Sequence, residues 1–160
     1  MKDIEFITDE KIFKYKVYGI VIHNGKILAL KMKNKISYCL PGGHVKLCEN
    51  NKDAILREIY EETKIKFSIE NDFAIVDNIF LEINNLKTHE ICFYYTVIPE
   101  NPDKIQFDNY SVIENDNGKL KQYNYEWLDI SAIKNVDFRP SFIKSKLISD
   151  NYDFEHIIHT

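Results

Sequence analysis

The apolar residues of this chain are concentrated in short runs that predict β-strands. Residues 18–23 are almost continuously apolar, Asn24-Gly25 supplies two residues that accept the positive φ of a tight turn, and residues 26–31 return with four apolar side chains. This pattern predicts a β-hairpin. Residues 91–98 are apolar at both odd and even positions, so we expect both faces of that strand to be covered. The sheet should therefore lie between helices instead of leaving one face open to water.

Two segments have the pattern of helices. Residues 51–64 place apolar side chains on one side of a predicted helix and charged side chains on the other. Pro140 suits the first position of a second helix, which continues through Leu147, because the missing N–H of proline has no intrahelical partner to lose there. The chain is thus expected to combine strands with at least these two helices.

The remaining segments predict loops and more weakly marked strands. Residues 40–43 read Leu-Pro-Gly-Gly and predict a loop, and residues 101–118 predict a loop of variable shape. Residues 73–83 are expected to be extended and to be followed by a turn at Asn84-Asn85. Residues 123–129 are the last predicted strand.

Length and composition bound the fold and the partners. The chain has 160 residues, of which 44% are hydrophobic, so a single domain over residues 1–160 with one core is expected, and it needs no disulfide to fold. Its 25 acidic residues exceed its 21 lysines and arginines, which is the wrong sign for a protein that coats long nucleic acid. A small phosphorylated ligand remains compatible with this charge if a metal offsets it.

Cysteine usage and hydropathy indicate the compartment. Cys39, Cys48 and Cys92 have no CxxC spacing and cannot all pair, so a disulfide framework is not expected and a reducing interior is the simpler location. No apolar run approaches the roughly 18 residues of a membrane span, and none follows the N-terminus as a leader would. We therefore expect a cytoplasmic protein with no membrane partner.

Three carboxylates share one face of the helix predicted at residues 51–64. Glu58, Glu61 and Glu62 stand at i, i+3 and i+4. Like charges at this spacing destabilise a helix by about 0.2–0.5 kcal/mol per pair, so the cluster calls for a neutralising partner. Hard oxygen ligands suit Mg²⁺ or Mn²⁺ better than zinc. The alternative is a solvated acidic face that is neutralised by nearby basic residues, namely Lys46, Lys52, Arg57 and Lys64.

The residues around this cluster favour a functional site. Gly42 and Gly43 precede it and can bring backbone amides close to an anion. Arg57 can reach back to Asp53 or Glu49 and hold one carboxylate in place. A metal site beside a loop that holds phosphate is a recognisable unit, because cations screen the substrate's charge and activate a water.

The spacing of residues 43–65 carries a family resemblance. Glu49 follows Gly43 after five residues, and after seven more comes Arg-Glu-Ile-Tyr-Glu-Glu-Thr-Lys-Ile, which begins at Arg57. This resembles the Nudix box, Gly-x5-Glu-x7-Arg-Glu-U-x-Glu-Glu-x-Gly-U, in which U is aliphatic. Lys64 stands where the box has its last glycine, which we expect to affect where the helix ends more than the chemistry.

The resemblance implies a fold and an activity. The fold it implies is α/β, a Nudix-type α/β/α sandwich with a mixed β-sheet between helices, and residues 127–130 resemble the family's late strand and following helix. The implied activity is hydrolysis of the pyrophosphate bond in a small nucleoside diphosphate linked to another moiety X. The implied cofactor is Mg²⁺, with Mn²⁺ as a substitute, and homodimers are common among such proteins.

The resemblance also implies roles for the residues of the box. Glu58 and Glu62 match the main ligands of the divalent ion, and Glu61 matches a residue that shares this task. Arg57 and Glu49 match the pair that orients them. We expect these five positions to form the catalytic and metal-binding site.

The general base and the substrate contacts are less closely defined. Members of the family use either a box glutamate or a distant carboxylate as the base, so Glu58 is the first candidate and Glu114 and Glu126 are alternatives. The expected substrate contacts lie in and beside the glycine pair, namely Gly42, Gly43, His44 and Tyr38.

The identity of X stays open. Residues 66–97 contain no proline, the first tyrosine there is Tyr94, and the Ser-Gln-Pro-Trp array is missing. These absences argue against members specific for ADP-ribose, dinucleoside polyphosphates and NADH, and they leave nucleotide sugars, modified nucleoside triphosphates and other small diphosphates. A non-catalytic sensor that binds a nucleotide metabolite with the same fold is the alternative function.

Overall fold

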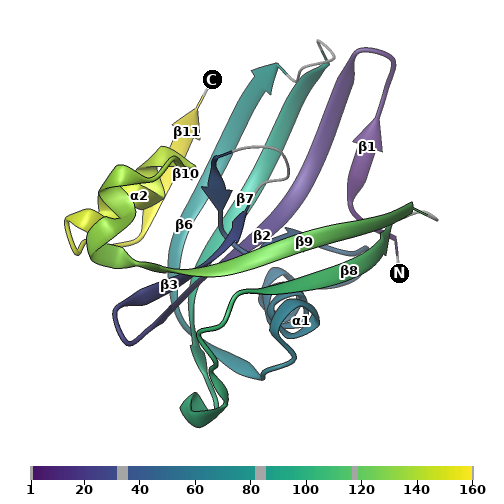
Figure 1. The fold of residues 1–160 in the computed structure, drawn as a ribbon. Coiled ribbons are helices and arrows are strands. Elements are labelled where there is room, and N and C mark those ends of the chain that lie inside the picture. The colour runs from purple at the N-terminus through teal and green to yellow at the C-terminus, as the bar shows by residue number, and fades with distance from the viewer. Residues whose placement is uncertain (1, 32–35, 82–85, 117–118, 160) are drawn as a thin grey trace.

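A computed structural model describes residues 2–31, 36–81, 86–116 and 119–159, with only the backbone of residues 114–116 and 119 (Figure 1). The turn predicted at Asn84-Asn85 lies outside these residues. The strands are β1 (Glu5–Ile7), β2 (Lys11–His23), β3 (Lys26–Lys31), β4 (Tyr38–Cys39), β5 (Gly42–His44), β6 (Phe67–Leu81), β7 (Lys87–Pro99), β8 (Tyr110–Asp116), β9 (Lys119–Asp129), β10 (Phe138–Arg139) and β11 (Glu155–His159). The helices are α1 (Asn51–Thr63), α2 (Ser141–Ile148) and the 3₁₀-helices η1 (Pro102–Lys104) and η2 (Ile130–Asn135).

The strands form a mixed sheet in two halves. In the first half, β2 pairs in parallel with β7, β7 pairs antiparallel with β6, and β11 adds in parallel to the outer edge of β6. In the second half, β3 pairs antiparallel with both β4 and β9, and β9 carries β8. The predicted hairpin joins the halves, but β2 and β3 pair only at Ile22–Ile27 and His23–Lys26. The two halves therefore diverge from a short shared segment.

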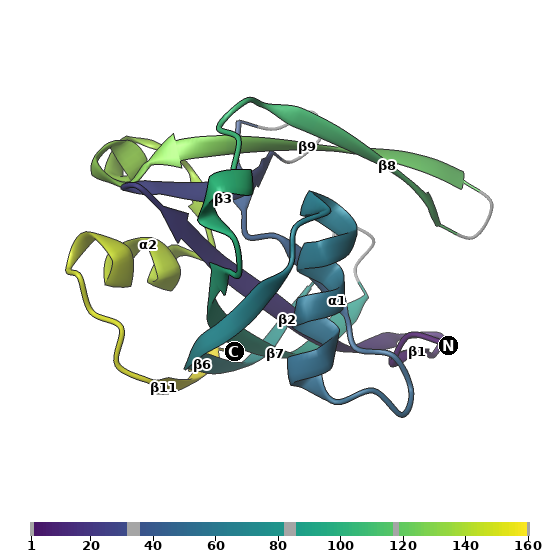
Figure 2. The ribbon, with the colours of Figure 1, turned by 90° about the horizontal axis from the view of Figure 1, so that it is seen from below.

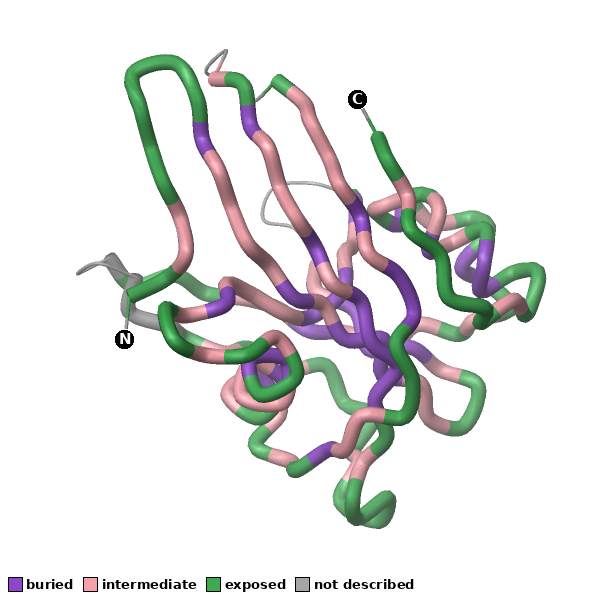
Figure 3. The backbone as a smooth tube through the Cα atoms, turned by 180° about the vertical axis from the view of Figure 1, so that it is seen from behind, coloured by how far each residue is buried: buried purple, intermediate pink, exposed green. Residues whose placement is uncertain are grey.

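One helix covers each face of the first half, as Figure 2 shows. On β2, Val17 and Val21 face α1 and join a core that includes Ile55, whereas Ile20 belongs to the core on the side of α2 with Ile143. Figure 3 shows the buried residues gathered where the strands pass between the two helices. The predicted α/β/α sandwich with a mixed sheet is confirmed.

The predicted loops differ most from the structure. Residues 42–44 form β5, which pairs antiparallel with β2, so the glycine pair is part of the sheet. Gly42 fits this close pairing because it has φ 144° and no side chain. In residues 101–118 the loop prediction was wrong for β8. This strand is specified by its antiparallel pairing with β9 and not by an alternation of apolar residues.

Several strands also differ from prediction. Strand β2 begins at Lys11, β6 at Phe67 and β9 at Lys119, each earlier than predicted, and β9 is followed by two further strands, β10 and β11. Pro140 is the residue that caps α2, and Ser141 is its first helical residue. Strand β11 escaped prediction because only Ile157 of its five residues is even half-buried, so it has no apolar period.

Among the described residues, no helix has the length and apolar character needed to cross a membrane. Cys39, Cys48 and Cys92 are free.

The end of α1 shows how the chain accommodates Lys64 in place of a glycine. The helix stops at Thr63, and Lys64 adopts the left-handed conformation, with φ 60° and ψ 15°. Its backbone N–H donates to the carbonyl of Tyr60 at 2.9 Å, which closes the last turn. A residue with a Cβ is strained in this conformation by roughly 1–2 kcal/mol, whereas glycine is not.

Lys64→Gly is therefore expected to raise the free energy of unfolding by about 0.5–1 kcal/mol, since glycine's greater freedom in the unfolded chain offsets part of the relieved strain. Urea denaturation measures this as a higher midpoint with an unchanged slope. Lys64→Ala is the matched control, because it removes the same side chain but keeps the Cβ. A glycine variant no more stable than the alanine variant would contradict the assignment of strain to Lys64.

Candidate active site

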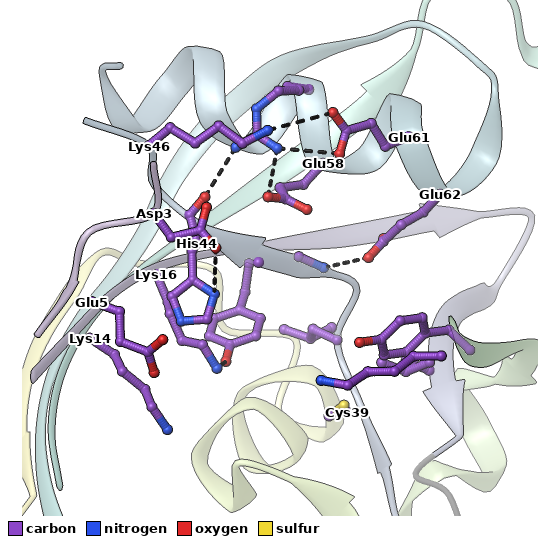
Figure 4. Close-up of a pocket in the computed structure, with 18 of the residues that line it drawn as sticks. Asp3, Glu5, Lys14, Lys16, Cys39, His44, Lys46, Glu58, Glu61 and Glu62 are labelled. Atoms are coloured by element: carbon purple, nitrogen blue, oxygen red, sulfur yellow. Dashed lines mark hydrogen bonds and ion pairs between the residues drawn. The ribbon is translucent and has the colours of Figure 1, made fainter. Parts of the chain in front are cut away.

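A cleft of about 690 Å³ opens where the two halves of the sheet diverge (Figure 4). Its volume lies within the range of small-molecule sites, roughly 300–1,000 Å³. Strands β2 and β5 and helix α1 line it from one half, and β3, β4 and β9 line it from the other. Residues from distant parts of the chain thus meet around one hollow.

Arg57 is the hub of the charged side chains on α1. Its Nε and Nη2 donate to the two carboxylate oxygens of Glu49 at 2.7 and 2.9 Å, and Nη2 also donates to the carbonyl of His44 at 3.0 Å. Glu49 in turn accepts from the backbone N–H of Lys46 at 3.0 Å. These hydrogen bonds hold the pKa of Glu49 below its ordinary value, and the hydrogen bonding from Arg57 has the largest effect. The sequence suggested Asp53 or Glu49 as the partner of Arg57, and in the structure Arg57 binds Glu49.

The same guanidinium binds two further carboxylates. Nη1 of Arg57 donates to Oε1 of Glu58 at 2.7 Å and to Oε2 of Glu61 at 3.3 Å. Glu58 is largely buried, with 14% of its side chain exposed, and this burial raises its pKa despite the arginine. Glu61 is 45% exposed, and Lys46 lies 4.0 Å from it. The like charges on α1 are thus offset mainly by one arginine.

Glu62 and the glycine strand are in direct contact. Glu62 is buried, and its Oε1 accepts from the backbone N–H of Gly42 at 3.2 Å. Gly43 lies so close to Glu58 that a Cβ on it would be 2.6 Å from the carboxyl carbon. The amide of Gly42, expected to face an anion of the substrate, is here bound by a carboxylate of the protein.

The donor set suits a hard divalent cation in its chemistry. Glu58, Glu61 and Glu62 all line the cleft and offer only carboxylate oxygens. Within the described ranges, no three His, Cys, Asp or Glu side chains converge closely enough to hold a metal ion. The reason is that Arg57 Nη1 lies between Glu58 and Glu61, and the Gly42 amide holds Glu62. A positive nitrogen therefore already bridges two of the three carboxylates.

His44 lines the cleft as expected. Its Nδ1 lies 4.0 Å from Asp3, and its Nε2 is buried without a hydrogen-bond partner among the residues that the structure describes. Burial lowers the pKa of His44 from its ordinary value near 6.5, with Lys16 acting in the same direction. The imidazole is therefore neutral at pH 7.

Tyr38 and Glu126 lie outside the cleft lining. Tyr38 is not among the residues that line the cleft; its hydroxyl donates to Glu126 at 2.7 Å, and Lys31 donates to the same carboxylate at 3.0 Å. Glu126 does not line the cleft either. Glu114 is in β8, and its side chain lies outside the described part of the structure.

The sequence reasoning missed several residues of the cleft. Lys14, Lys16 and Tyr18 face it from β2, and Tyr123 and Tyr125 face it from β9. The first three stand at alternate positions, so a strand extended back from residue 18 would have placed them on one face. The polar start of β2 concealed this period.

A family model described as the NUDIX domain matches residues 14–146, which include the whole cleft-lining part of β2, α1 and β9. The chain belongs to the Nudix family. The box residues described above are therefore this Nudix chain's own version of the family motif.

Among curated proteins, an ADP-ribose pyrophosphatase of Methanocaldococcus jannaschii is 37% identical over 70 residues, a match that spans 37% of this chain and 41% of that relative. Among solved structures, the MutT protein of Bacillus halodurans has a TM-score of 0.55 at 17% identity and covers 89% of each chain. The MutT protein of Methanosarcina mazei Go1 has a TM-score of 0.53 at 20% identity, over 89% of this chain and 95% of its own. At these identities the structural likeness establishes the shared Nudix fold.

Proposed function

We propose that this Nudix protein hydrolyses the pyrophosphate bond of a small nucleoside diphosphate linked to another moiety X. The observation that carries the proposal is the gathering of Glu58, Glu61 and Glu62 in one cleft, where the Arg57 guanidinium binds the first two and the Gly42 amide of the glycine strand β5 binds the third. The archaeal relative named as an ADP-ribose pyrophosphatase supports this class of substrate. The aligned region covers less than half of either protein, so the identity of X has to be determined by experiment.

Nudix hydrolases generally use divalent metals, and we infer that Mg²⁺, or Mn²⁺ in its place, is held by Glu58, Glu61 and Glu62. When bound, such a cation offsets the charge of the phosphates and makes water a better nucleophile at neutral pH. The hard carboxylate donors and the excess of negative charge on this face of α1 support the assignment.

The protein's own residues position the reacting groups. Arg57, held by Glu49 and the carbonyl of His44, fixes where Glu58 and Glu61 stand. We assign Glu58 the role of general base, which accepts the proton of the attacking water, because it is largely buried at the cleft wall and burial raises its pKa. Glu126 suits this role less well, because its carboxylate is bound by Tyr38 and Lys31 away from the cleft.

A substrate panel tests the proposal. Formation of the nucleoside monophosphate product is measured by chromatography for ADP-ribose, UDP-glucose and nucleoside triphosphates with Mg²⁺, and again after the metal is removed with EDTA. We expect turnover of at least one member, its loss with EDTA and its return with added Mg²⁺. Glu62→Gln should lower kcat/KM by about tenfold or more, as the loss of a metal ligand does.

Glu70→Gln is the control, since Glu70 is an exposed glutamate outside the cleft. Unchanged turnover in Glu62→Gln would contradict the role given to Glu62. Tight nucleotide binding with no turnover across the whole panel would favour the non-catalytic sensor instead.

A further inference from the structure

The cleft has a second charged end that the proposed hydrolysis does not use. Figure 4 shows Glu58 and Glu61 on one side of the cleft and Lys14 and Lys16 on the other. Lys16 projects from β2, and 21% of its side chain is exposed. A lysine kept this far from bulk water on a cleft wall requires a reason beyond solubility.

The Lys16 ammonium group is fixed by the protein but not saturated by it. It donates one hydrogen bond, to the hydroxyl of Tyr18 at 3.1 Å, and it lies 5.6 Å from the centre of the same ring. Its nearest carboxylate oxygen among the described residues, on Glu90, is 3.7 Å away, which is an ion pair without a hydrogen bond. An ammonium group has three donors, so two are available to a ligand in the cleft.

The carboxylate of Glu90 supports this position from the neighbouring strand. Glu90 is on β7, its side chain is 12% exposed, and it is not among the residues that line the cleft. It also lies 4.0 Å from the ammonium of Lys14. Glu90 thus holds the lysine charges in place from β7, and Lys16 itself lines the cleft.

The strand register places Lys16 beside β5, the strand that Glu58 contacts. Lys16 pairs with His44 and Val17 pairs with Gly43, so the two pairs are about 3.3 Å apart along the strand. The carboxylate of Glu58 lies directly against Gly43. Side chains alternate along a strand, so Lys16 points to the face of β2 opposite Val17 and α1, and it shares with Glu58 the lining of one cleft.

We propose that Lys16 is a specificity-determining residue that selects substrates whose X moiety carries an oxyanion, either a further phosphate or a carboxylate. This inference rests on the proposed function. A lysine ammonium is a compact charge that favours phosphate and carboxylate oxygens, and a charge-assisted hydrogen bond from a fixed donor is the stronger kind. The nucleoside is uncharged, so an oxyanion at this end of the cleft belongs to X.

Matched substrates separate the two sources of the oxyanion. UDP-glucuronate differs from UDP-glucose by a carboxylate, and UTP carries a phosphate in place of the sugar. For the wild type we expect kcat/KM to be at least about tenfold higher for one or both charged members than for UDP-glucose, with the difference in KM. The charged member that is preferred identifies the source.

Variants of Lys16 test its part in this preference. Lys16→Met should abolish the preference and leave kcat for UDP-glucose within about twofold, whereas Lys16→Arg should retain it. Glu90→Gln removes the ion pair that holds Lys16 in place, and should weaken the preference without abolishing it. Lys134→Met, at an exposed lysine of η2, is the control for loss of a positive charge.

Binding without turnover separates this inference from the proposed function. Calorimetric Kd values for UDP-glucuronate, UTP and UDP-glucose are measured in EDTA, with wild type and Lys16→Met. If Kd is lower for the charged substrates and Lys16→Met abolishes this difference, the inference is supported even when no substrate is hydrolysed. Absence of hydrolysis would contradict only the proposed function. Turnover with no preference for charged substrates would overturn the inference. An equal loss of affinity for charged and neutral substrates in Lys16→Met would also overturn it, because Lys16 would then contact the diphosphate itself. Failure to bind all three would also overturn it.

Discussion

Gly43→Ala is expected to leave the protein folded and to lower its hydrolytic activity about a hundredfold or more. A Cβ at this position would lie 2.6–2.7 Å from the carboxyl carbon and both oxygens of Glu58. Because this is the end of a flexible side chain, the carboxylate can move away without disturbing the backbone. It would then lose its 2.7 Å hydrogen bond to Arg57 and its place at the cleft wall. A displacement of about 1 Å at a reacting group costs roughly a hundredfold in rate.

The measurement is kcat/KM with the best substrate of the panel, beside thermal unfolding to confirm that the variant is folded. Adding Glu58→Asp to Gly43→Ala shortens the displaced side chain by one methylene. Glu58→Asp should therefore lower kcat/KM less in the Gly43→Ala background than in the wild type. Full activity in a normally stable Gly43→Ala would remove Glu58 from the site as we describe it.

Gly42→Ala is expected to have a different effect, a fall of about 3 kcal/mol or more in the free energy of unfolding. A Cβ on Gly42 would lie 2.2 Å from the carbonyl oxygen of Val17 and 2.9 Å from the Cα of Tyr18. Both atoms are backbone atoms of the central strand, so relief requires β5 to separate from β2. The φ of 144° adds strain for any residue with a side chain.

Urea denaturation of wild type and variant measures the loss. Gly25→Ala is the matched control, because Gly25 also has a positive φ, 73°, but nothing lies within 4 Å of an added Cβ. Its cost should be about 1–2 kcal/mol, from the backbone conformation alone. If Gly42→Ala were no more destabilising than Gly25→Ala, the close pairing of β5 with β2 would not hold in solution.

The elements that local sequence could predict are those with a strong local signal. The hairpin at Asn24-Gly25, the helix that carries Glu58 and the fit of Arg57 to Glu49 all depend on residues fewer than about fifteen positions apart. In each case a turn residue, a helical period or a charge pair is visible in a short window.

The features that sequence could not predict depend on contacts between distant segments. Strand β5 contains two glycines and a histidine, so no side-chain pattern marks it, and its pairing with β2 decides its conformation. The hydrogen bond between Tyr38 and Glu126 joins residues 88 positions apart, through the common neighbour β3. Likewise Lys16 lines the cleft beside β5, whose pairing with β2 no local pattern indicates.

The short junction between the two halves of the sheet has an evolutionary consequence. The carboxylates of α1 are anchored to the half that contains β2 and β5, whereas Tyr123 and Tyr125 reach the same cleft from β9 in the other half. Only two residue pairs connect β2 with β3. Mutations that reshape the β9 wall can therefore alter which molecules are accepted while the hydrolytic apparatus keeps its geometry, so new preferences can arise in this scaffold without rebuilding its chemistry.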